Sequence, residues 1–357
     1  MKIIFSGGGS LGPVTPLLAV IEAWKKLDPS VQCVWIGTKN GPEKDLIENE
    51  NIVFQSIAVA KFARYFSLEW ILLPFKLLFA FSQALRIISK EKPDLVASAG
   101  GFTSVPVVIS AWLLGIPSWI HQSDVLPILT NKILAPFASC ITVAWKLTLP
   151  SFPISKTKWI GNPVRESMLG VSKEQGEKFF NLDSQKPTVF VVGGGGGALW
   201  INNQMEKIGK KLSERANVIH VTGTGKTKDN FSEFGKNYVV KEMLGKDISS
   251  AFACADIVVT RAGMGGLTEV CAFKKPAIVI PMPNSPQERN AQILNDTDSA
   301  IVFNQIGATA DDLYNEIISL LDDKKKQQEL SQHLATILPT NTALQFVEHV
   351  RLCCLQK

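Results

Sequence analysis

Short apolar runs alternate with amphipathic segments along the first half of the chain. Each run is rich in Val, Ile, Trp or Phe and ends at a glycine or a polar residue. The predicted strands are residues 2–6, 32–37, 52–58, 95–99, 118–121 and 140–144. Several are separated by segments with helical periodicity, such as residues 16–26 and 77–90. Buried strands joined by helices are typical of a parallel sheet that helices cover on both faces.

The same pattern starts again in the second half of the chain. Here the predicted strands are residues 188–192, 218–222, 238–240, 257–260 and 277–281. Prolines and polar residues interrupt the periodicity near residues 149–162, where a linker is expected. The sequence therefore predicts two doubly wound α/β domains, residues 1–160 and residues 161–339. We expect the last helix, at residues 340–357, to pack back onto the first domain.

Glycine clusters follow the first predicted strand of each half. The first cluster starts at Gly7, and the second is a run of five glycines that starts at Gly193. Glycine lets the backbone approach a ligand closely, and the helix that follows offers unpaired N–H groups to an anion. The first cluster has neither the acidic partner of a dinucleotide-binding loop nor the Lys-Ser/Thr pair of a P-loop. We predict two phosphate-binding loops at the carboxyl ends of the strands, with a plain structural turn as the alternative.

Polar side chains accompany three further strand ends. Glu269 lies about one turn into the helix after the glycine turn at residues 263–266, where a carboxylate can bind both hydroxyls of a ribose. Stabilisation of the helix dipole is its alternative role. The amides of Gln287 and Asn290 suit the hydroxyls of a sugar, or cap a helix. His121 and Asp124 follow a strand and are candidate acid–base residues, although a single histidine is often structural.

Residues 61–81 are more aromatic and apolar than one buried helix face requires, and they include several Lys and Arg residues. This mixture favours an element that lies among anionic lipid headgroups, with core packing as a partial alternative. The whole chain carries 37 Lys and Arg against 32 Asp and Glu, a net charge of +5, which fits an anionic substrate or membrane without selecting either.

Targeting and metal-binding signals are weak in this sequence. No apolar stretch is long enough for a spanning helix, and the glycines at residues 7–9 interrupt any signal peptide. The six cysteines show neither a CxxC pair nor zinc-finger spacing, so we expect buried thiols in a reducing compartment and no metal site. We expect a cytoplasmic protein with peripheral membrane contact.

Taken in order, these motifs resemble the MurG family of bacterial UDP-N-acetylglucosamine transferases. The resemblance covers almost the whole chain and is carried by residues 8–16, 100–106, 114–121, 129–132, 161–165, 193–198, 263–269 and 287–291. It implies a GT-B fold, in which two Rossmann-like domains face a central cleft. It also implies an inverting transfer of GlcNAc from UDP-GlcNAc to the C4 hydroxyl of the muramyl sugar of lipid I, which forms lipid II in peptidoglycan synthesis.

The resemblance also implies where each substrate binds. The expected donor-binding residues are Arg165, Gly195, Gly196, Gly197, Leu244, Gly265, Gly266, Leu267, Glu269, Gln287 and Asn290. The expected contacts to the acceptor diphosphate are Gly9, Ser10, Gly12, Gly101, Thr103 and Ser104. The expected membrane contacts are Phe66, Trp70, Phe75, Lys76 and Phe79. No metal or other cofactor is implied, and the expected partners are UDP-GlcNAc, the lipid-linked acceptor, an anionic membrane at its cytoplasmic face and other cell-wall synthesis proteins, with no nucleic acid.

Several positions depart from the family pattern. Pro13 stands where the family usually has a histidine that is a proposed base, so Asp124 and His121 are the candidates to accept the proton, and we favour Asp124.

Two alternative functions stay open at this stage. One is a related GT-B glycosyltransferase with another lipid or a soluble acceptor, and the other is a catalytically silent scaffold of the same fold.

Overall fold

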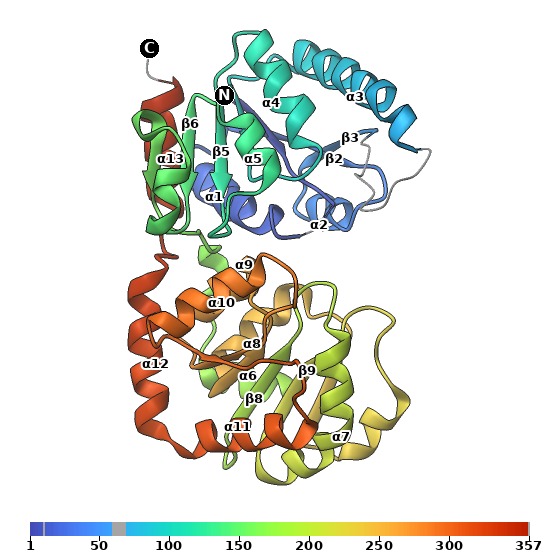
Figure 1. The fold of residues 1–357 in the computed structure, drawn as a ribbon, viewed down its shortest axis with the longest axis vertical. Coiled ribbons are helices and arrows are strands. Elements are labelled where there is room, and N and C mark those ends of the chain that lie inside the picture. Colours follow the sequence, from blue (N-terminus) through green and yellow to red (C-terminus); the bar gives the residue numbers. More distant parts are fainter. Residues whose placement is uncertain (10, 59–68, 356–357) are drawn as a thin grey trace. The chain divides into compact units, whose positions relative to one another are not determined.

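The computed structural model describes residues 1–9, 11–58 and 69–355 (Figure 1). It divides the chain into two compact units. The N-terminal unit is Met1–Arg165 together with Thr342–Lys357, and the C-terminal unit is Glu166–Asn341. The division between the units therefore falls after Arg165, whereas the sequence-based boundary is after residue 160.

The N-terminal unit contains one parallel sheet in the order β3-β2-β1-β4-β5-β6-β7. Its strands are β1 (Lys2–Ser6), β2 (Gln32–Thr38), β3 (Val53–Ile57), β4 (Leu95–Ser98), β5 (Ser118–Gln122), β6 (Cys140–Val143) and β7 (Thr157–Trp159). Its helices are α1 (Val14–Leu27), α2 (Glu43–Asn49), α3 (Glu69–Glu91), α4 (Ser104–Leu113), α5 (Leu129–Leu134) and α13 (Ala343–Val350), which continues into the π-helical turn η6 (Arg351–Leu355). The short 3-10 turns η1 (Lys146–Ser151) and η2 (Ile154–Lys156) precede β7.

The C-terminal unit repeats this plan with a parallel sheet in the order β10-β9-β8-β11-β12-β13. Its strands are β8 (Thr188–Val192), β9 (Asn217–Val221), β10 (Tyr238–Lys241), β11 (Ile257–Thr260), β12 (Ala277–Val279) and β13 (Ile301–Val302). Its helices are α6 (Lys173–Phe180), α7 (Leu199–Arg215), α8 (Ile248–Cys254), α9 (Met264–Ala272), α10 (Gln287–Asp296), α11 (Ala310–Asp322) and α12 (Lys324–Ile337), with 3-10 turns η3 (Glu166–Met168), η4 (Asp229–Phe234) and η5 (Gly245–Asp247).

The predicted strands are confirmed in position and direction, and two short edge strands, β7 and β13, were not predicted. The central strands are buried on both faces, which explains their continuous apolar sequences. The edge strands β7 and β13 are only partly buried and very short, so they carry too few apolar residues to show a pattern.

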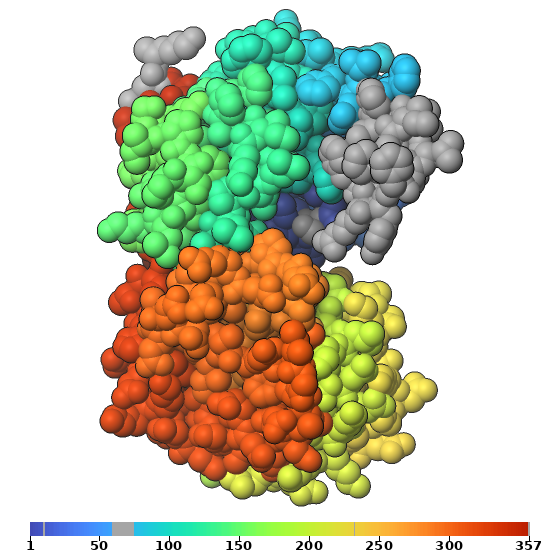
Figure 2. Space-filling view, in the orientation of Figure 1, coloured from blue at the N-terminus to red at the C-terminus, as the bar shows by residue number. Residues whose placement is uncertain are grey.

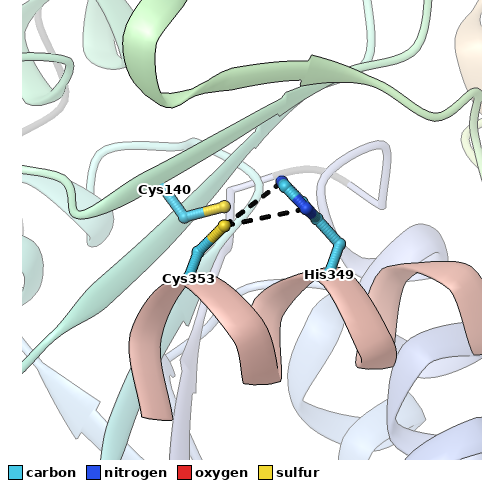
Figure 3. A group of neighbouring side chains, drawn as sticks. All are labelled: Cys140, His349 and Cys353. Atoms are coloured by element: carbon cyan, nitrogen blue, oxygen red, sulfur yellow. Dashed lines mark hydrogen bonds between the residues drawn. The ribbon is translucent and has the colours of Figure 1, made fainter. Parts of the chain in front are cut away.

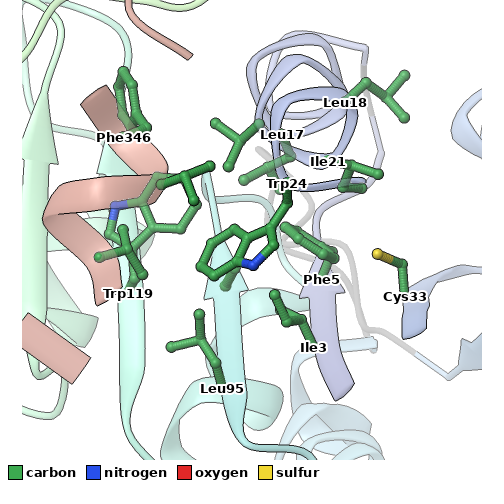
Figure 4. Close-up of a cluster of buried hydrophobic side chains, with 14 of the residues drawn as sticks. Ile3, Phe5, Leu17, Leu18, Ile21, Trp24, Cys33, Leu95, Trp119 and Phe346 are labelled. Atoms are coloured by element: carbon green, nitrogen blue, oxygen red, sulfur yellow. The ribbon is translucent and has the colours of Figure 1, made fainter. Parts of the chain in front are cut away.

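One core of the N-terminal unit lies under α1 and α13 (Figure 4). Phe5 of β1, Trp24 of α1 and Trp119 of β5 are fully buried there, and Phe346 of α13 packs 5.6 Å from Trp119 between ring centroids. The C-terminal helix therefore completes a core built from the first residues of the chain. Burial of large aromatic side chains is among the strongest apolar contributions available to a fold, about 1.5–3 kcal/mol each.

Each sheet reverses its strand order once. In the N-terminal unit the reversal lies between β1 and β4, and in the C-terminal unit it lies between β8 and β11. At such a switch point the loops that leave the two strands turn to opposite faces and leave a crevice at the carboxyl edge. Both predicted phosphate loops start at these strands.

Candidate active-site crevices

The loops after β1 and β4 touch at the switch point of the N-terminal unit. A methyl group added at Gly101 would lie 2.6 Å from the carbonyl oxygen of Gly8, and Gly101 has a φ of +94°. Only glycine fits this position without strain. The two glycine loops expected to bind the acceptor are therefore brought together by close backbone contact.

A buried carboxylate that the sequence reading missed organises this crevice. Glu43, at the start of α2, is fully buried and accepts hydrogen bonds from the backbone N–H groups of Gly9 (3.2 Å) and Thr38 (2.7 Å) and from the Thr38 hydroxyl (2.5 Å). Gly8 and Gly41 leave room for it, because a methyl group at either would lie within 2.3 Å of its oxygens. The amide of Gly9, expected to face a phosphate, is thus bonded to Glu43. A glutamate in the first turn of a helix is typical of dipole stabilisation, so this role could not be predicted from the sequence.

The remaining predicted acceptor residues differ in exposure. Gly12 is exposed at the end of the first loop, whereas Thr103 and Ser104 are fully buried at the start of α4. The Ser104 hydroxyl donates to the Gly100 carbonyl oxygen and accepts from Ser98, so it supports the loop from inside. The buried Thr103 hydroxyl has no hydrogen-bond partner among the described residues. Ser10 lies outside the described residues.

His121 is held inside the sheet by both ring nitrogens. With the Asn162 amide as oriented here, Nε2 donates to its Oδ1 (2.8 Å), and Nδ1 therefore accepts from the Thr142 hydroxyl (2.9 Å). The Thr142 oxygen in turn accepts from the indole N–H of Trp119 (2.8 Å). Burial lowers the pKa of His121 to about 4. In this structure the side chain is neutral and fully buried, so the geometry argues against His121 as the proton acceptor and for a structural role.

The surroundings of Asp124, three residues further along the chain, differ from those of His121. It is partly exposed in the loop that follows β5, and its backbone carbonyl accepts a hydrogen bond from the Gln122 amide (2.8 Å). The Gln122 oxygen accepts from Asn131 and from the backbone of Ile128, which fixes the loop on α5. Of the two candidate bases, only Asp124 is placed where solvent and a ligand can reach it.

The switch point of the C-terminal unit is formed by glycine backbone. Gly197 has a φ of +69°, and a methyl group there would lie 1.9 Å from the Thr222 carbonyl oxygen. A methyl group added at Gly223 would lie 2.6 Å from the Gly196 carbonyl oxygen. Gly195 and Gly196 are exposed, and a methyl group at Gly196 would meet nothing within 4 Å. The glycine run thus combines positions required by packing with positions open to a ligand.

A chain of buried polar groups supports this loop from below. The Tyr238 hydroxyl bonds to His220 Nδ1 (2.9 Å), His220 Nε2 to Asn202 Oδ1 (3.1 Å), and the Asn202 amide donates to the Thr222 carbonyl oxygen (2.9 Å). Burial lowers the pKa of His220 to about 4 and raises that of Tyr238. The neutral His220 therefore links Tyr238 to Asn202, and this chain of hydrogen bonds orients the Thr222 carbonyl oxygen at the loop.

A lysine that was not predicted from the sequence, Lys226, also lies at this loop. Lys226 Nζ donates to the carbonyl oxygen of Gly196 at 2.5 Å, and the lysine is exposed. The residues just before it, Gly223 to Gly225, are rich in glycine, which is a sequence signal for a second phosphate-facing turn. An exposed ammonium beside a glycine nest suits a diphosphate.

Helix α9 begins beside the same edge of the sheet, with Gly263 as its N-cap. The first four N–H groups of a helix have no partner within it, which here means those from Gly263 to Gly266. The amide of Leu267 already donates to the Gly263 carbonyl oxygen (3.0 Å), and its side chain is fully buried. Gly265 and Gly266 thus keep the predicted place at the helix start, while Leu267 is a core residue.

The predicted sugar and ribose residues surround this helix start. Glu269 is partly exposed in the second turn of α9. A methyl group at Gly263 would lie 3.6 Å from the Gln287 side-chain nitrogen, so this amide faces the helix start. Asn290 is fully buried and donates to the Ala262 carbonyl oxygen (3.1 Å), which anchors α10 to the turn before α9.

Two further predicted donor residues lie on other segments of the chain. Leu244 is buried at the turn after β10, where its carbonyl oxygen accepts from the amide of Asp247 (2.9 Å). Arg165 forms an ion pair with Glu50 (2.9 Å) and ends the first stretch of the N-terminal unit. In this structure the guanidinium is therefore engaged within the N-terminal unit.

Exposed apolar side chains lie on α3 and on the neighbouring helices α4 and α5, which form part of the surface of the N-terminal unit in Figure 2. Phe75, Leu78 and Phe79 are 70%, 67% and 56% exposed, and Lys76 between them is exposed as well. Further exposed apolar residues lie on α4, at its end and on α5, namely Trp112, Leu113, Leu114, Leu129 and Ile133. Phe66 and the side chain of Trp70 lie outside the described part. Among the described residues, no helix is both long enough and apolar enough to cross a membrane.

Comparison with known families accounts for both units. Residues 3–143 match the family model of the glycosyltransferase family 28 N-terminal domain, and residues 188–344 match that of the family 28 C-terminal domain. The two matches together cover most of the chain. The predicted α/β fold of GT-B type, with two doubly wound domains, is confirmed.

Named relatives narrow the family further. The UDP-N-acetylglucosamine--N-acetylmuramyl-(pentapeptide) pyrophosphoryl-undecaprenol N-acetylglucosamine transferase of Clostridium perfringens strain SM101 is 39% identical over 294 residues, covering 82% of this chain and 81% of the relative. The protein of the same name from Clostridium kluyveri is 35% identical over 339 residues, covering 93% and 92%. The crystal structure of Acinetobacter baumannii MurG matches with a TM-score of 0.73 at 25% identity, covering 98% and 99%. The chain belongs to the MurG family within glycosyltransferase family 28.

Proposed function

We propose that this protein transfers GlcNAc from UDP-GlcNAc to the C4 hydroxyl of the muramyl sugar of lipid I, with inversion at the anomeric carbon. The product is lipid II, the lipid-linked precursor of peptidoglycan. Support comes from the activity named for relatives that align over most of the chain. The observation that carries the proposal is the C-terminal switch point, where the glycine-rich start of α9, the partly exposed Glu269 and the Gln287 amide lie near one another.

The donor is placed in the C-terminal unit by matching its chemistry to these groups. The N–H groups of Gly263 to Gly266 and the exposed backbone of Gly195 and Gly196 bind the diphosphate, assisted by Lys226. Glu269 accepts hydrogen bonds from both ribose hydroxyls, and the Gln287 amide contacts the sugar. Asn290 positions the turn before α9 from beneath, and the backbone near Leu244 reads the uracil.

The reaction follows from this placement. The acceptor C4 oxygen forms a bond to the anomeric carbon of GlcNAc while the bond from that carbon to the diphosphate oxygen breaks. The hydroxyl proton passes to the Asp124 carboxylate, and the negative charge that develops on UDP is stabilised by helix amides and Lys226. These fixed donors supply the stabilisation that a divalent cation provides in other transferases, so we propose a reaction that requires no metal.

The acceptor is assigned to the N-terminal unit. Its diphosphate lies over the loop that ends at Gly12 and beside Gly101, while Glu43 holds that loop in shape. Its polyprenyl chain lies along the exposed apolar residues of α3, α4 and α5, which rest on the cytoplasmic face of the membrane. The exposed Lys76 and Lys132 interact there with anionic headgroups.

Glycosyl transfer by the purified full-length protein tests this function. Labelled UDP-GlcNAc and a lipid I analogue are incubated with a metal chelator, and lipid-linked product is counted for the wild type, Glu269→Ala and the control Glu288→Ala. Glu288 is exposed on the neighbouring helix α10. We expect full activity in the wild type and control, and a loss of about 100-fold or more in Glu269→Ala, because two hydrogen bonds to a charged acceptor are removed.

The outcomes of this experiment test the reaction and the donor site separately. No product from the wild type at any acceptor concentration contradicts the proposed reaction. Product that is equally abundant with Glu269→Ala leaves the reaction in place and contradicts the donor site.

Membrane contact is tested separately with vesicles that contain anionic lipid. Phe75→Ser together with Phe79→Ser should reduce sedimentation with the vesicles by about tenfold or more, since each exposed aromatic contributes on the order of 1–2 kcal/mol of burial. The control is Ile306→Ser, which removes an equally exposed apolar residue (70%) from the C-terminal unit. Equal binding of all three proteins would contradict the assignment of this surface.

A further inference from the structure

Three potential metal ligands from distant parts of the chain meet in the N-terminal unit (Figure 3). Cys140 is the first residue of β6, His349 lies on α13 and Cys353 lies on η6. Their sulfur and nitrogen atoms all lie within 4.8 Å of one another. In Figure 3 the Cys140 and Cys353 thiols point toward each other, with the His349 ring beside them.

The fold holds these residues in place independently of any ligand. His349 and Cys353 are four residues apart, so they project from the same face of the last helix. Phe346, one turn earlier, packs against Trp119 and against His121, at 5.6 Å and 5.1 Å between centroids. Cys140 pairs directly with Trp119 in the sheet. The helix face that carries the ligands is thus fixed over the strand that carries Cys140.

The distances fit tetrahedral coordination. The Cys353 sulfur lies 3.6 Å from His349 Nε2 and 3.7 Å from Nδ1. With metal–sulfur bonds of about 2.3 Å and metal–nitrogen bonds of about 2.0 Å, a tetrahedral zinc ion separates its sulfur and nitrogen ligands by about 3.5 Å. This S–N separation is that of a zinc site. The imidazole must rotate to aim one nitrogen at the ion, because the sulfur is nearly equidistant from both ring nitrogens.

The site is open to solvent on one side, and its thiols lose their protons when a metal binds. Cys353 is exposed and His349 partly buried, which leaves a path for the ion.

We propose that Cys140, His349 and Cys353 bind one thiophilic divalent cation of the zinc class. Two thiolates and one neutral imidazole balance the ion's charge, each thiol releases one proton on binding, and a water completes the tetrahedron. The ion fastens the C-terminal helix to β6. This site is structural, lies outside every residue assigned to the donor or acceptor, and goes beyond the proposed transferase activity.

Zinc binding by the full-length protein tests the proposal. The reduced protein, kept in a non-coordinating phosphine, is loaded with Zn²⁺, dialysed and analysed for metal, and its affinity is measured by competition with a chromophoric chelator. Cys353→Ser and His349→Gln remove accessible ligands with little risk to folding. Cys33→Ala and His333→Gln are matched controls, since Cys33 lies in β2 and the exposed His333 lies on α12.

We expect about one Zn²⁺ per chain in the wild type and in both controls, and at least a tenfold loss of affinity in each ligand variant. Zn²⁺ should also slow alkylation of Cys353 and raise the thermal midpoint of the wild type but not of the ligand variants. Absence of bound zinc in the wild type overturns the proposal, as does an affinity that Cys353→Ser and His349→Gln leave unchanged. Transferase activity is measured in parallel, and its presence or absence does not bear on the outcome.

Discussion

The two switch points share one topology and carry opposite charge. In the N-terminal unit the crevice is organised by the buried Glu43 carboxylate, which binds the amide of Gly9. In the C-terminal unit the equivalent crevice presents exposed glycine backbone and the ammonium of Lys226. The Gly9 amide is therefore already bonded in one crevice, whereas the other crevice presents exposed glycine backbone and a cation to an anion.

This difference suggests a division of labour between the two units. A nucleotide diphosphate carries concentrated negative charge and suits the C-terminal crevice. The N-terminal unit instead has a partly exposed carboxylate, Asp124, in the loop after β5, which suits the removal of a proton from an acceptor hydroxyl. A glycine loop after a strand is thus not by itself evidence for phosphate, because the partners of its amides decide what it can bind.

The largest effect should come from Asp124→Asn. The amide cannot accept the proton, so kcat should fall by about 10²- to 10⁴-fold while the Kd of UDP-GlcNAc stays unchanged. Single-turnover transfer and calorimetric binding of UDP-GlcNAc measure the two quantities. Asp45→Asn, an exposed carboxylate on α2, is the control. A kcat close to that of the wild type would remove Asp124 from the mechanism.

The second comparison concerns the buried histidine of each unit, His121 and His220. Both have a pKa lowered to about 4 by burial, so between pH 6.5 and 4 the unfolded chain binds a proton that the folded chain does not. The stabilisation is fully present above pH 6.5 and is lost as the pH falls toward 4. Each histidine should account for about 3 kcal/mol of unfolding free energy over this range.

Denaturation at several pH values checks this expectation. Seven of the eight tryptophans lie in the N-terminal unit and only Trp200 lies in the C-terminal unit, so tryptophan fluorescence reports mainly on the former. His121→Gln should flatten the pH dependence of the fluorescence transition, and His220→Gln should leave it unchanged. Equal slopes for the wild type and His121→Gln would contradict the buried, neutral state of His121.

A smaller effect is expected from the C-terminal glycine run. Gly197→Ala places a methyl group 1.9 Å from the Thr222 carbonyl oxygen and forces the two loops apart. Strain of about 1–3 kcal/mol should weaken UDP-GlcNAc binding by roughly tenfold to hundredfold. Gly170→Ala, in the same unit but outside the donor site, is the control, because a methyl group there meets nothing within 4 Å. Calorimetry should separate the two variants, and similar affinities would show that the contact does not shape the donor site.

The smallest effect should come from Glu43→Gln. The Gly9 N–H and the Thr38 N–H donate to different oxygens of Glu43, so the NH₂ group of a glutamine would face one of these two N–H groups. The loss of about 1.4 kcal/mol should raise the KM for the acceptor about tenfold and leave the Kd for UDP-GlcNAc unchanged. Steady-state kinetics with Glu48→Gln as an exposed control on the same helix measures this. A change in donor affinity instead would contradict the separation of roles between the units.

The strands and the glycine loops could be predicted from the sequence, whereas the hydrogen-bond partners of the candidate site residues could not. The continuous apolar runs predict the central strands, because strands buried on both faces need no polar positions. His121 illustrates the other case. Its position at a strand end suggests chemistry, but its partners Thr142 and Asn162 come from elsewhere in the chain and place it in the interior.

Local physics thus determined the α/β architecture, the repetition of the strand–glycine–helix unit and the carboxylate on α9, because each depends on neighbouring residues alone. Only the tertiary structure decided that Glu43 reaches Gly9, that Leu267 is a core residue, and that Cys140 meets His349 and Cys353. These contacts depend on which strand lies beside which and on where the last helix docks. The spacing of these residues along the chain does not determine their contacts, because contacts between distant segments depend on how the whole sheet and its helices pack.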